Sequence, residues 1–151
     1  MTTLTASLLS DRSSLSNATG AAPAPSYSKK AIWTGRVLTG FAALFLAFDG
    51  IYKLVASPEA AAAATVDLGW RFETLRGLGV LEIVCLALYL VPRTAPIGAL
   101  LWTGYLGGAI ATHLRIGNPW ASHTLFPIYV AVFIWGGLWL RDRRVRAFFA
   151  R

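Results

Sequence analysis

The segment FAALFLAFDGIYKLV, at residues 41–55, governs how the rest of the chain is interpreted. It is almost entirely apolar, yet it places Asp49 and Lys53 one helical turn apart on the same helix face. Ionisable groups are costly inside a membrane span, and they usually face a protein interior or a water-filled cavity. The pair is therefore a candidate functional site, and the alternative is a structural ion pair that fixes the helix register.

The composition of the whole chain is that of a membrane protein. Of its 151 residues, 56% are hydrophobic, and the mean hydropathy is +0.56. Four apolar segments are each close to the length of about 17–25 residues that crosses a bilayer. They cover residues 32–55, 75–91, 96–116 and 124–140. We predict an all-α fold, a polytopic membrane protein built as a bundle of four transmembrane helices.

The placement of positive charge predicts the orientation of this bundle. The net charge is +7, and a cytoplasmic N-terminus would put most of the basic residues on the inner flanks. The inner set is Lys29, Lys30, Arg36, Arg93, Arg141, Arg143, Arg144, Arg146 and Arg151, and the outer set is Lys53, Arg71, Arg76 and Arg115. Positive charge favours the cytoplasmic side, so we expect both termini there. We expect the basic flank to meet anionic lipid rather than nucleic acid.

Residues outside the apolar segments suggest tails and short connections. Residues 1–30 are rich in Ser, Thr, Ala and Pro and predict a disordered tail, while residues 147–151 form a short C-terminal tail. The alanine-rich residues 59–65 predict either a short helix on the outer surface or a helical loop, with Trp70 as an interface anchor. Pro92 and Pro96 bracket a turn, which predicts that the second and third spans form an antiparallel hairpin.

The third apolar segment carries small residues at four-residue spacing. Thr103 and Gly107 form one such pair, and Gly104 and Gly108 form another. Small side chains let helix backbones approach closely in a membrane. We therefore predict that these four residues form a helix-packing face at the centre of the bundle, and a contact between two copies of the chain is the alternative.

The polar residues of the four segments are predicted to lie toward the outer half of the bundle. A helical rise of about 1.5 Å per residue places Asp49 about 25 Å and Glu82 about 13 Å from the cytoplasmic face. Asp49 has Lys53 on its own face and could also meet Arg76. Glu82 has no local partner, so its partner must lie on another helix or be a proton.

These positions predict an outward-facing polar pocket. In it Glu82 or His113 would move a proton, Arg76 and Lys53 would hold an anion or a carbonyl oxygen, and Tyr52 and Tyr105 would flank a ring. The full set of candidate ligand-binding residues is Asp49, Tyr52, Lys53, Arg76, Glu82, Tyr105, His113, Arg115 and His123.

Redox and metal chemistry have little support in the sequence. Cys85 is the only cysteine, which excludes a Cys-x-x-Cys mechanism. His113 and His123 could be considered as axial haem ligands, but nothing else specifies a haem pocket. The ligand spacing of a metal site on one helix is also missing, so no metal site is predicted.

Several short motifs occur together in one order. They are FDGIYK at residues 48–53, LRGLGVLE at 75–82, PRT at 92–94, TGYLGGA at 103–109, HLR at 113–115 and HTLFP at 123–127. In these motifs the chain resembles the DoxX-like family of small bacterial membrane proteins, over roughly residues 32–146. The resemblance implies a four-helix protein of the bacterial inner membrane. The wider family includes a subunit associated with a thiosulfate-oxidising, quinone-reducing complex and partners of redox-stress proteins.

The residues and the resemblance together lead to one functional hypothesis and two alternatives. The hypothesis is a non-autonomous accessory or quinone-interacting subunit of a redox or stress-response system, with a quinone as the candidate cofactor. The first alternative is a membrane scaffold or assembly protein without ligand chemistry. The second is a proton-coupled carrier, which would need to oligomerise. Expected partners are the lipid bilayer, a membrane or redox protein and a second copy of the chain, and whether the protein is an enzyme stays open.

Overall fold

The computed structural model describes residues 28–66 and 68–149, and within these ranges regular structure is entirely helical. The elements are α2 (Lys29–Val55), α3 (Pro58–Val66), α4 (Phe72–Leu90), α5 (Ala95–Arg115), the π-helical turn η1 (Trp120–Thr124), α6 (Phe126–Arg141) and α7 (Arg143–Phe149). The all-α prediction is confirmed. Of the predicted disordered tail, residues 1–27 lie outside the described residues, and residues 29 and 30 already belong to α2.

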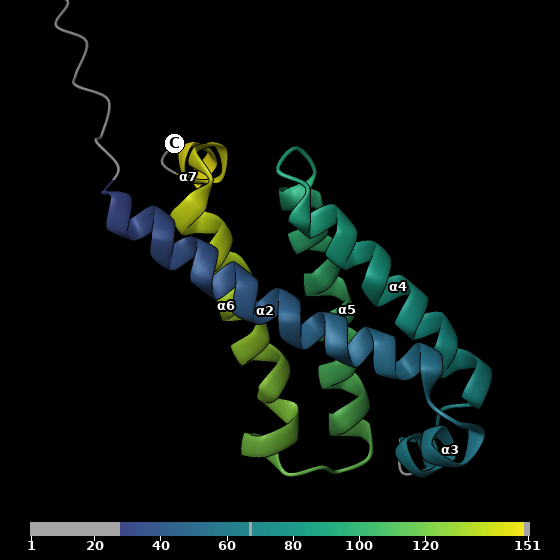
Figure 1. The fold of residues 1–151 in the computed structure, drawn as a ribbon. Coiled ribbons are helices and arrows are strands. Elements are labelled where there is room, and N and C mark those ends of the chain that lie inside the picture. The colour runs from purple at the N-terminus through teal and green to yellow at the C-terminus, as the bar shows by residue number, and fades with distance from the viewer. Residues whose placement is uncertain (1–27, 67, 150–151) are drawn as a thin grey trace, which may run out of the picture.

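The four long helices contact one another in a ring. α2 packs against α4 and α6, and α5 packs against the same two helices. Figure 1 shows α2 running obliquely across α6 and α5 toward the lower end of α4, with α3 at one end of the molecule and α7 at the other. The beginning of α2 and the end of α7 therefore lie at the same end of the described chain.

Two helical segments of the described chain are long and apolar enough to cross a membrane, as judged by length and composition. They are Lys29–Val55, which is α2, and Trp120–Arg141, which joins η1 to α6. The other two long helices do not meet these criteria; α4, for instance, carries three charged residues, Glu73, Arg76 and Glu82.

The hairpin predicted around Pro92 and Pro96 is present between α4 and α5. Pro96 lies in the first turn of α5, where the missing N–H leaves no intrahelical bond unmade. The hydroxyl of Thr94 donates to the carbonyl oxygen of Leu88 at 2.8 Å. Gly98 completes the contact, because a Cβ at this position would lie 2.4 Å from the backbone nitrogen of Tyr89.

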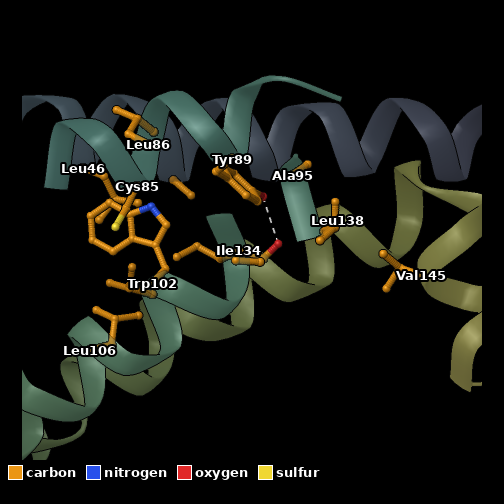
Figure 2. Close-up of a cluster of buried hydrophobic side chains, with 13 residues drawn as sticks. Leu46, Cys85, Leu86, Tyr89, Ala95, Trp102, Leu106, Ile134, Leu138 and Val145 are labelled. Atoms are coloured by element: carbon orange, nitrogen blue, oxygen red, sulfur yellow. Dashed lines mark hydrogen bonds between the residues drawn. The ribbon is translucent and has the colours of Figure 1, made fainter. Parts of the chain in front are cut away.

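An apolar core fills the space between the four helices (Figure 2). Trp102 of α5 is fully buried and lies beside Cys85, Leu46 and Leu86 in the close-up. Tyr89 is also fully buried, and its hydroxyl donates to the carbonyl oxygen of Ile134 at 2.9 Å. The hydroxyl also lies 3.3 Å from Thr39 Oγ1, so the polar end of this buried aromatic side chain has hydrogen-bond partners on α2 and α6.

The small residues of α5 pack only in part within the chain: Ala99, at the same four-residue spacing, is fully buried in the core, whereas the three predicted glycines are not. A Cβ built on Gly104, Gly107 or Gly108 would meet nothing within 4 Å, and all three glycines are exposed. Of the four predicted residues, Thr103 alone takes part in a helix contact, because its hydroxyl accepts a hydrogen bond from Trp135 Nε1 at 2.9 Å.

Other glycines make the close approaches instead. A Cβ on Gly35 would lie 2.8 Å from Leu140 Cβ, and a Cβ on Gly137 would lie 3.0 Å from the Thr39 backbone nitrogen, so α2 and α6 meet there. A Cβ on Gly79 of α4 would lie 3.0 Å from the Gly50 carbonyl oxygen of α2. α2 thus supplies one glycine to each of its two helix contacts.

The predicted depth difference between Asp49 and Glu82 is wrong. Lys53 Nζ lies 2.5 Å from a carboxylate oxygen of each residue. The prediction assumed helices parallel to the membrane normal, whereas α2 is inclined relative to α5 and α6 (Figure 1). Because α2 crosses α4 where Gly50 meets Gly79, Glu82 comes level with the C-terminal part of α2.

Two glycines end helices and so position residues near the site. Gly69 and Gly117 both have positive φ, 68° and 71°. After α3 the Trp70 N–H donates to the Thr65 carbonyl oxygen, and after α5 the Asn118 N–H donates to the His113 carbonyl oxygen, both at 3.1 Å. Both ends have the Schellman pattern, in which a glycine in the left-handed region closes the helix.

Candidate functional site

A cavity of about 870 Å³ opens between the four long helices, on the side of the molecule where α3 lies. One face of α2 contributes Phe45, Asp49, Tyr52 and Lys53, which follow the spacing of a single helix face. Most of the other lining residues are apolar. They are Leu46, Leu68, Trp70, Leu75, Leu78, Leu81, Trp102, Leu106, Ala109, Ala111, Phe126, Pro127 and Val130, with Gly104, Gly108 and Thr112 from α5.

The polar end of the cavity is organised by the ammonium group of Lys53. It donates to Asp49 Oδ2 and to Glu82 Oε1, each at 2.5 Å, and to the Tyr105 hydroxyl at 3.2 Å. The Tyr105 hydroxyl in turn donates to Glu82 Oε1. Three helices therefore contribute to one hydrogen-bonded group, which we call the Lys53 cluster: Asp49, Lys53, Glu82 and Tyr105.

Burial differs sharply among the charged members of this cluster. The side chain of Asp49 is 38% exposed, that of Lys53 is 16% exposed and that of Glu82 is fully buried. Asp49 and Lys53 line the cavity, while Glu82 lies behind them. Glu82 Oε2 has no hydrogen-bond partner among the described residues. This buried oxygen faces Gly50, where a Cβ would come within 3.1 Å of it.

Arg115 and the residues that follow α3 line the end of the cavity away from Lys53. The Arg115 guanidinium donates to the Leu68 carbonyl oxygen at 2.8 Å and lies 5.9 Å from the centre of the Trp70 ring. His113 lies beside it on the cavity wall, with its Nδ1 atom 2.8 Å from Asn118 Nδ2. We call Leu68, Trp70 and Arg115 the roof of the cavity.

The structure brings together most, but not all, of the predicted pocket residues. Asp49, Tyr52, Lys53, Tyr105, His113 and Arg115 line the cavity, and Glu82 is bonded to two of them. Arg76 is exposed on α4, with its guanidinium 4.8 Å from the centre of the Phe72 ring, and it is not part of the lining. The His123 ring lies 5.6 Å from that of His113, outside the cavity.

Arg76 therefore does not pair with Asp49. The two residues share no ion pair in the part of the chain that the structure describes. In a helix the side chains of residues 76 and 82 point in different directions, because six residues correspond to about 600° of rotation at 3.6 residues per turn. Since Glu82 points inward, Arg76 points away from the interior.

The apolar side chains that line the cavity were not among the site residues predicted from the sequence. Trp102 and Tyr105 lie three residues apart on one face of α5, and Phe45 lies four residues before Asp49 on α2. Helical spacing from the polar residues would have found these side chains. Leu68 and Phe126 carry no such signal, since they reach the cavity only through the way the chain is folded.

The site combines a large apolar volume with a small group of hydrogen-bonding side chains at one end. Cavities of this kind are typical of sites for small apolar molecules with one polar group. Among the described residues, no three His, Cys, Asp or Glu side chains lie close enough to hold a metal ion. The chemistry available to the cluster is hydrogen bonding, charge pairing and proton exchange.

Comparison with known proteins identifies the family to which the chain belongs. A family model described as the DoxX-like family matches residues 37–137, more than half of the chain. No curated protein and no solved structure matches the chain.

Proposed function

Since the chain belongs to the DoxX-like family, we propose that it is a four-span protein of the bacterial inner membrane that binds a lipid-soluble ring compound, such as a quinone, as an accessory subunit of a redox or stress-response system. Family membership and the two apolar segments support a membrane protein. The remaining parts of the proposal rest on the cavity.

The main support for this proposal is that the apolar and polar side chains occupy different parts of the cavity. Its walls are aliphatic and aromatic, while its polar end presents an ammonium group and a carboxylate, with a tyrosine hydroxyl beside them. A quinone has a flat apolar ring and two carbonyl oxygens, which accept hydrogen bonds but do not donate them. The three donors of Lys53 are all engaged in the cluster, so a carbonyl oxygen would replace the Tyr105 hydroxyl, the most distant of its three acceptors. Tyr52 and Trp102 supply aromatic surfaces for the ring.

The topology and the placement of basic residues support one orientation of the protein in the membrane. The described chain begins and ends at the same end of the molecule (Figure 1), which fits four crossings. The basic residues of α7 and of the α4–α5 turn lie at that end, so the positive-inside rule favours a cytoplasmic location for it. The cavity would then open toward the outer half of the bilayer.

A direct binding measurement tests the proposal. The purified protein, in lipid nanodiscs, is titrated with a short-chain benzoquinone, and quenching of tryptophan fluorescence reports binding, because Trp70 and Trp102 line the cavity. Saturable quenching is expected for the wild type. It should weaken at least tenfold in Gly104→Leu, whose side chain would project into the cavity, and in Lys53→Met. Absence of saturable binding by the wild type would refute the proposed ligand class.

A second function, that of a scaffold, is favoured by one observation. Gly107 is exposed and has open space around its Cα, yet it does not line the cavity. A helix of a partner could approach closely at such a position. Gly107→Leu therefore separates the two functions, since it would disrupt a partner contact and leave the cavity unchanged. Loss of a co-purifying protein in Gly107→Leu, with no quinone bound by the wild type, would favour the scaffold.

A further inference from the structure

The charges of the Lys53 cluster do not balance. Asp49 and Glu82 each carry a negative charge when ionised, and Lys53 carries the one positive charge that faces them. Tyr105 is bonded to Glu82 as a hydroxyl donor and contributes no charge. With both carboxyl groups ionised, the cluster has a net charge of −1 in a largely apolar setting. Such a charge is costly, and protonation of one carboxyl group removes it.

Among the described residues, no other packed element supplies the missing positive charge. On α5, His113 also lines the cavity, but its ring lies at the far end, beside Asn118. On α4 the nearest titratable side chain is the thiol of Cys85, which is neutral at physiological pH. α6 contributes Phe126, Pro127 and Val130 to the cavity, none of which titrates. Arg115 is at the opposite end, bonded to the Leu68 carbonyl oxygen.

The geometry indicates which oxygen would carry a proton. Glu82 Oε1 accepts hydrogen bonds from Lys53 and Tyr105, whereas Oε2 is buried against Gly50 without a partner. An ionised oxygen that accepts no hydrogen bond in the interior is strongly disfavoured, and an O–H group in the same place costs less. The side chain of Asp49, by contrast, is 38% exposed and faces the cavity, so its carboxylate is accessible to water.

We propose that Glu82 is a proton-binding site that takes up one proton on Oε2 when an apolar occupant replaces water in the cavity, and releases it when water returns. The inference rests on the proposed function, because the occupant is the lipid-soluble ligand. The proton comes from water, an O–H bond forms at Glu82, the net charge of the cluster changes from −1 to 0, and no electron moves. Occupancy of the cavity is thereby coupled to pH.

The coupling has a simple physical origin. Water in the cavity solvates the exposed edge of the cluster at Asp49 and Lys53, and it tolerates the extra negative charge. An apolar occupant removes that water and lowers the local dielectric, which strengthens the preference for the neutral cluster. By linkage, a ligand whose binding takes up a proton binds more tightly at lower pH.

Infrared spectroscopy tests the proton site without any ligand. The full chain in nanodiscs is titrated between about pH 8 and pH 6, a range in which an ordinary glutamate, with a pKa of about 4.3, stays ionised. A carboxylic acid band should grow as the pH falls. It should be absent in Glu82→Gln and preserved in Glu73→Gln, which removes an exposed glutamate of the same helix. A wild type without this band, or a band that persists in Glu82→Gln, would overturn the proposal.

Proton counting tests the coupling to occupancy. A short-chain benzoquinone is added to the wild type in weakly buffered solution, and a pH indicator should report uptake of about one proton per bound molecule at saturation. In Asp49→Asn, Lys53 faces one carboxylate and the charges already balance, so uptake should vanish although Glu82 is intact. Binding without proton uptake by the wild type would contradict the inference.

The two tests separate this inference from the proposed function. Failure of the quinone to bind counts against the ligand class alone, because the infrared titration decides on the proton site by itself. Asp49→Asn also guards against misfolding of Glu82→Gln, since both variants are expected to lose the response for the same electrostatic reason. A carboxylic acid band in Asp49→Asn as strong as that of the wild type would contradict the charge-balance argument.

Discussion

Gly79 of α4 lies directly against the backbone of α2, where a Cβ would come within 3.0 Å of the Gly50 carbonyl oxygen and of Lys53 Cβ. This contact sets how closely the two helices approach. It also sets the reach of Lys53, whose ammonium group must bridge Asp49 on its own helix and Glu82 on the neighbouring one. The contact at Gly79 therefore determines both the packing of α2 against α4 and the geometry of the Lys53 cluster.

Substitution of Gly79 should separate packing from helix propensity. Gly79→Ala is expected to destabilise the protein by about 1–3 kcal/mol, because the added methyl group overpacks the contact between α2 and α4. Gly77→Ala is the matched control, since a Cβ there meets nothing within 4 Å. It should be neutral or stabilising by about 0.5–1 kcal/mol through helix propensity. Thermal unfolding in detergent measures both, and equal effects would contradict the packing argument.

Removal of the Lys53 ammonium should be harmful only while the carboxyl groups remain. We expect Lys53→Met to cost about 3 kcal/mol, the low end of the range for breaking a buried pair, because Asp49 is partly exposed. The triple variant Asp49→Asn, Lys53→Met, Glu82→Gln should recover most of this loss. Chemical unfolding of the series gives the coupling energy. If Lys53→Met costs as much in the neutralised background, the ionic interaction does not explain the effect.

The hydroxyl of Tyr89 should contribute measurably to the stability of the core. Tyr89→Phe removes the donor to the Ile134 carbonyl oxygen and leaves a buried acceptor without this partner. The expected loss is about 1–3 kcal/mol. Tyr129→Phe is the matched control, because the Tyr129 side chain is 50% exposed. A loss in Tyr129→Phe equal to that in Tyr89→Phe would show that burial of the hydrogen bond is not the cause.

The attachment of α7 should depend on pH only under strongly acidic conditions. Burial alone would raise the pKa of Asp142, but hydrogen bonds from the Arg144 backbone and guanidinium lower it below the ordinary value of 3.8. A carboxyl group whose pKa is lowered on folding stabilises the fold above its ordinary pKa, and the contribution is lost as pH falls through the lowered value.

Arg144 also donates to the Pro92 carbonyl oxygen, which ties α7 to the α4–α5 turn. Amide hydrogen exchange in α7 should therefore be constant from neutral pH down to about pH 4, after correction for the intrinsic rate, and increase only below that value. Asp142→Asn should show faster exchange already at neutral pH. Faster exchange of the wild type near pH 6 would contradict this assignment.

Much of the fold was predictable because it depends on local properties. The apolar segments predicted the four long helices to within a few residues, and Pro92 and Pro96 predicted the hairpin. The i, i+4 spacing placed Asp49 and Lys53 on one face, and they do form an ion pair. These features need no knowledge of how the helices are arranged.

The relations between helices were not predictable in the same way. The spacing of Gly104 and Gly108 looks as suitable for packing as any other, yet the contacts use Gly50 and Gly79. Which small residues meet depends on the crossing geometry, and that geometry results from the sum of many side-chain contacts. The same inclination of α2 brought Glu82 to Lys53, which no calculation of depth along a straight helix could anticipate.

The roof of the cavity has a consequence for the lifetime of a complex. One hydrogen bond, from Arg115 to the Leu68 carbonyl oxygen, fastens it. This hydrogen bond is exposed, so water competes for both partners and its net contribution is about 0.5–1.5 kcal/mol. The closed arrangement is then favoured by no more than about tenfold. Exchange of an occupant would then require a loop motion, typically nanoseconds to microseconds, and no separation of the long helices. Loss of this hydrogen bond is therefore expected to shorten the residence time of an occupant, although Arg115 lies at the end opposite the Lys53 cluster.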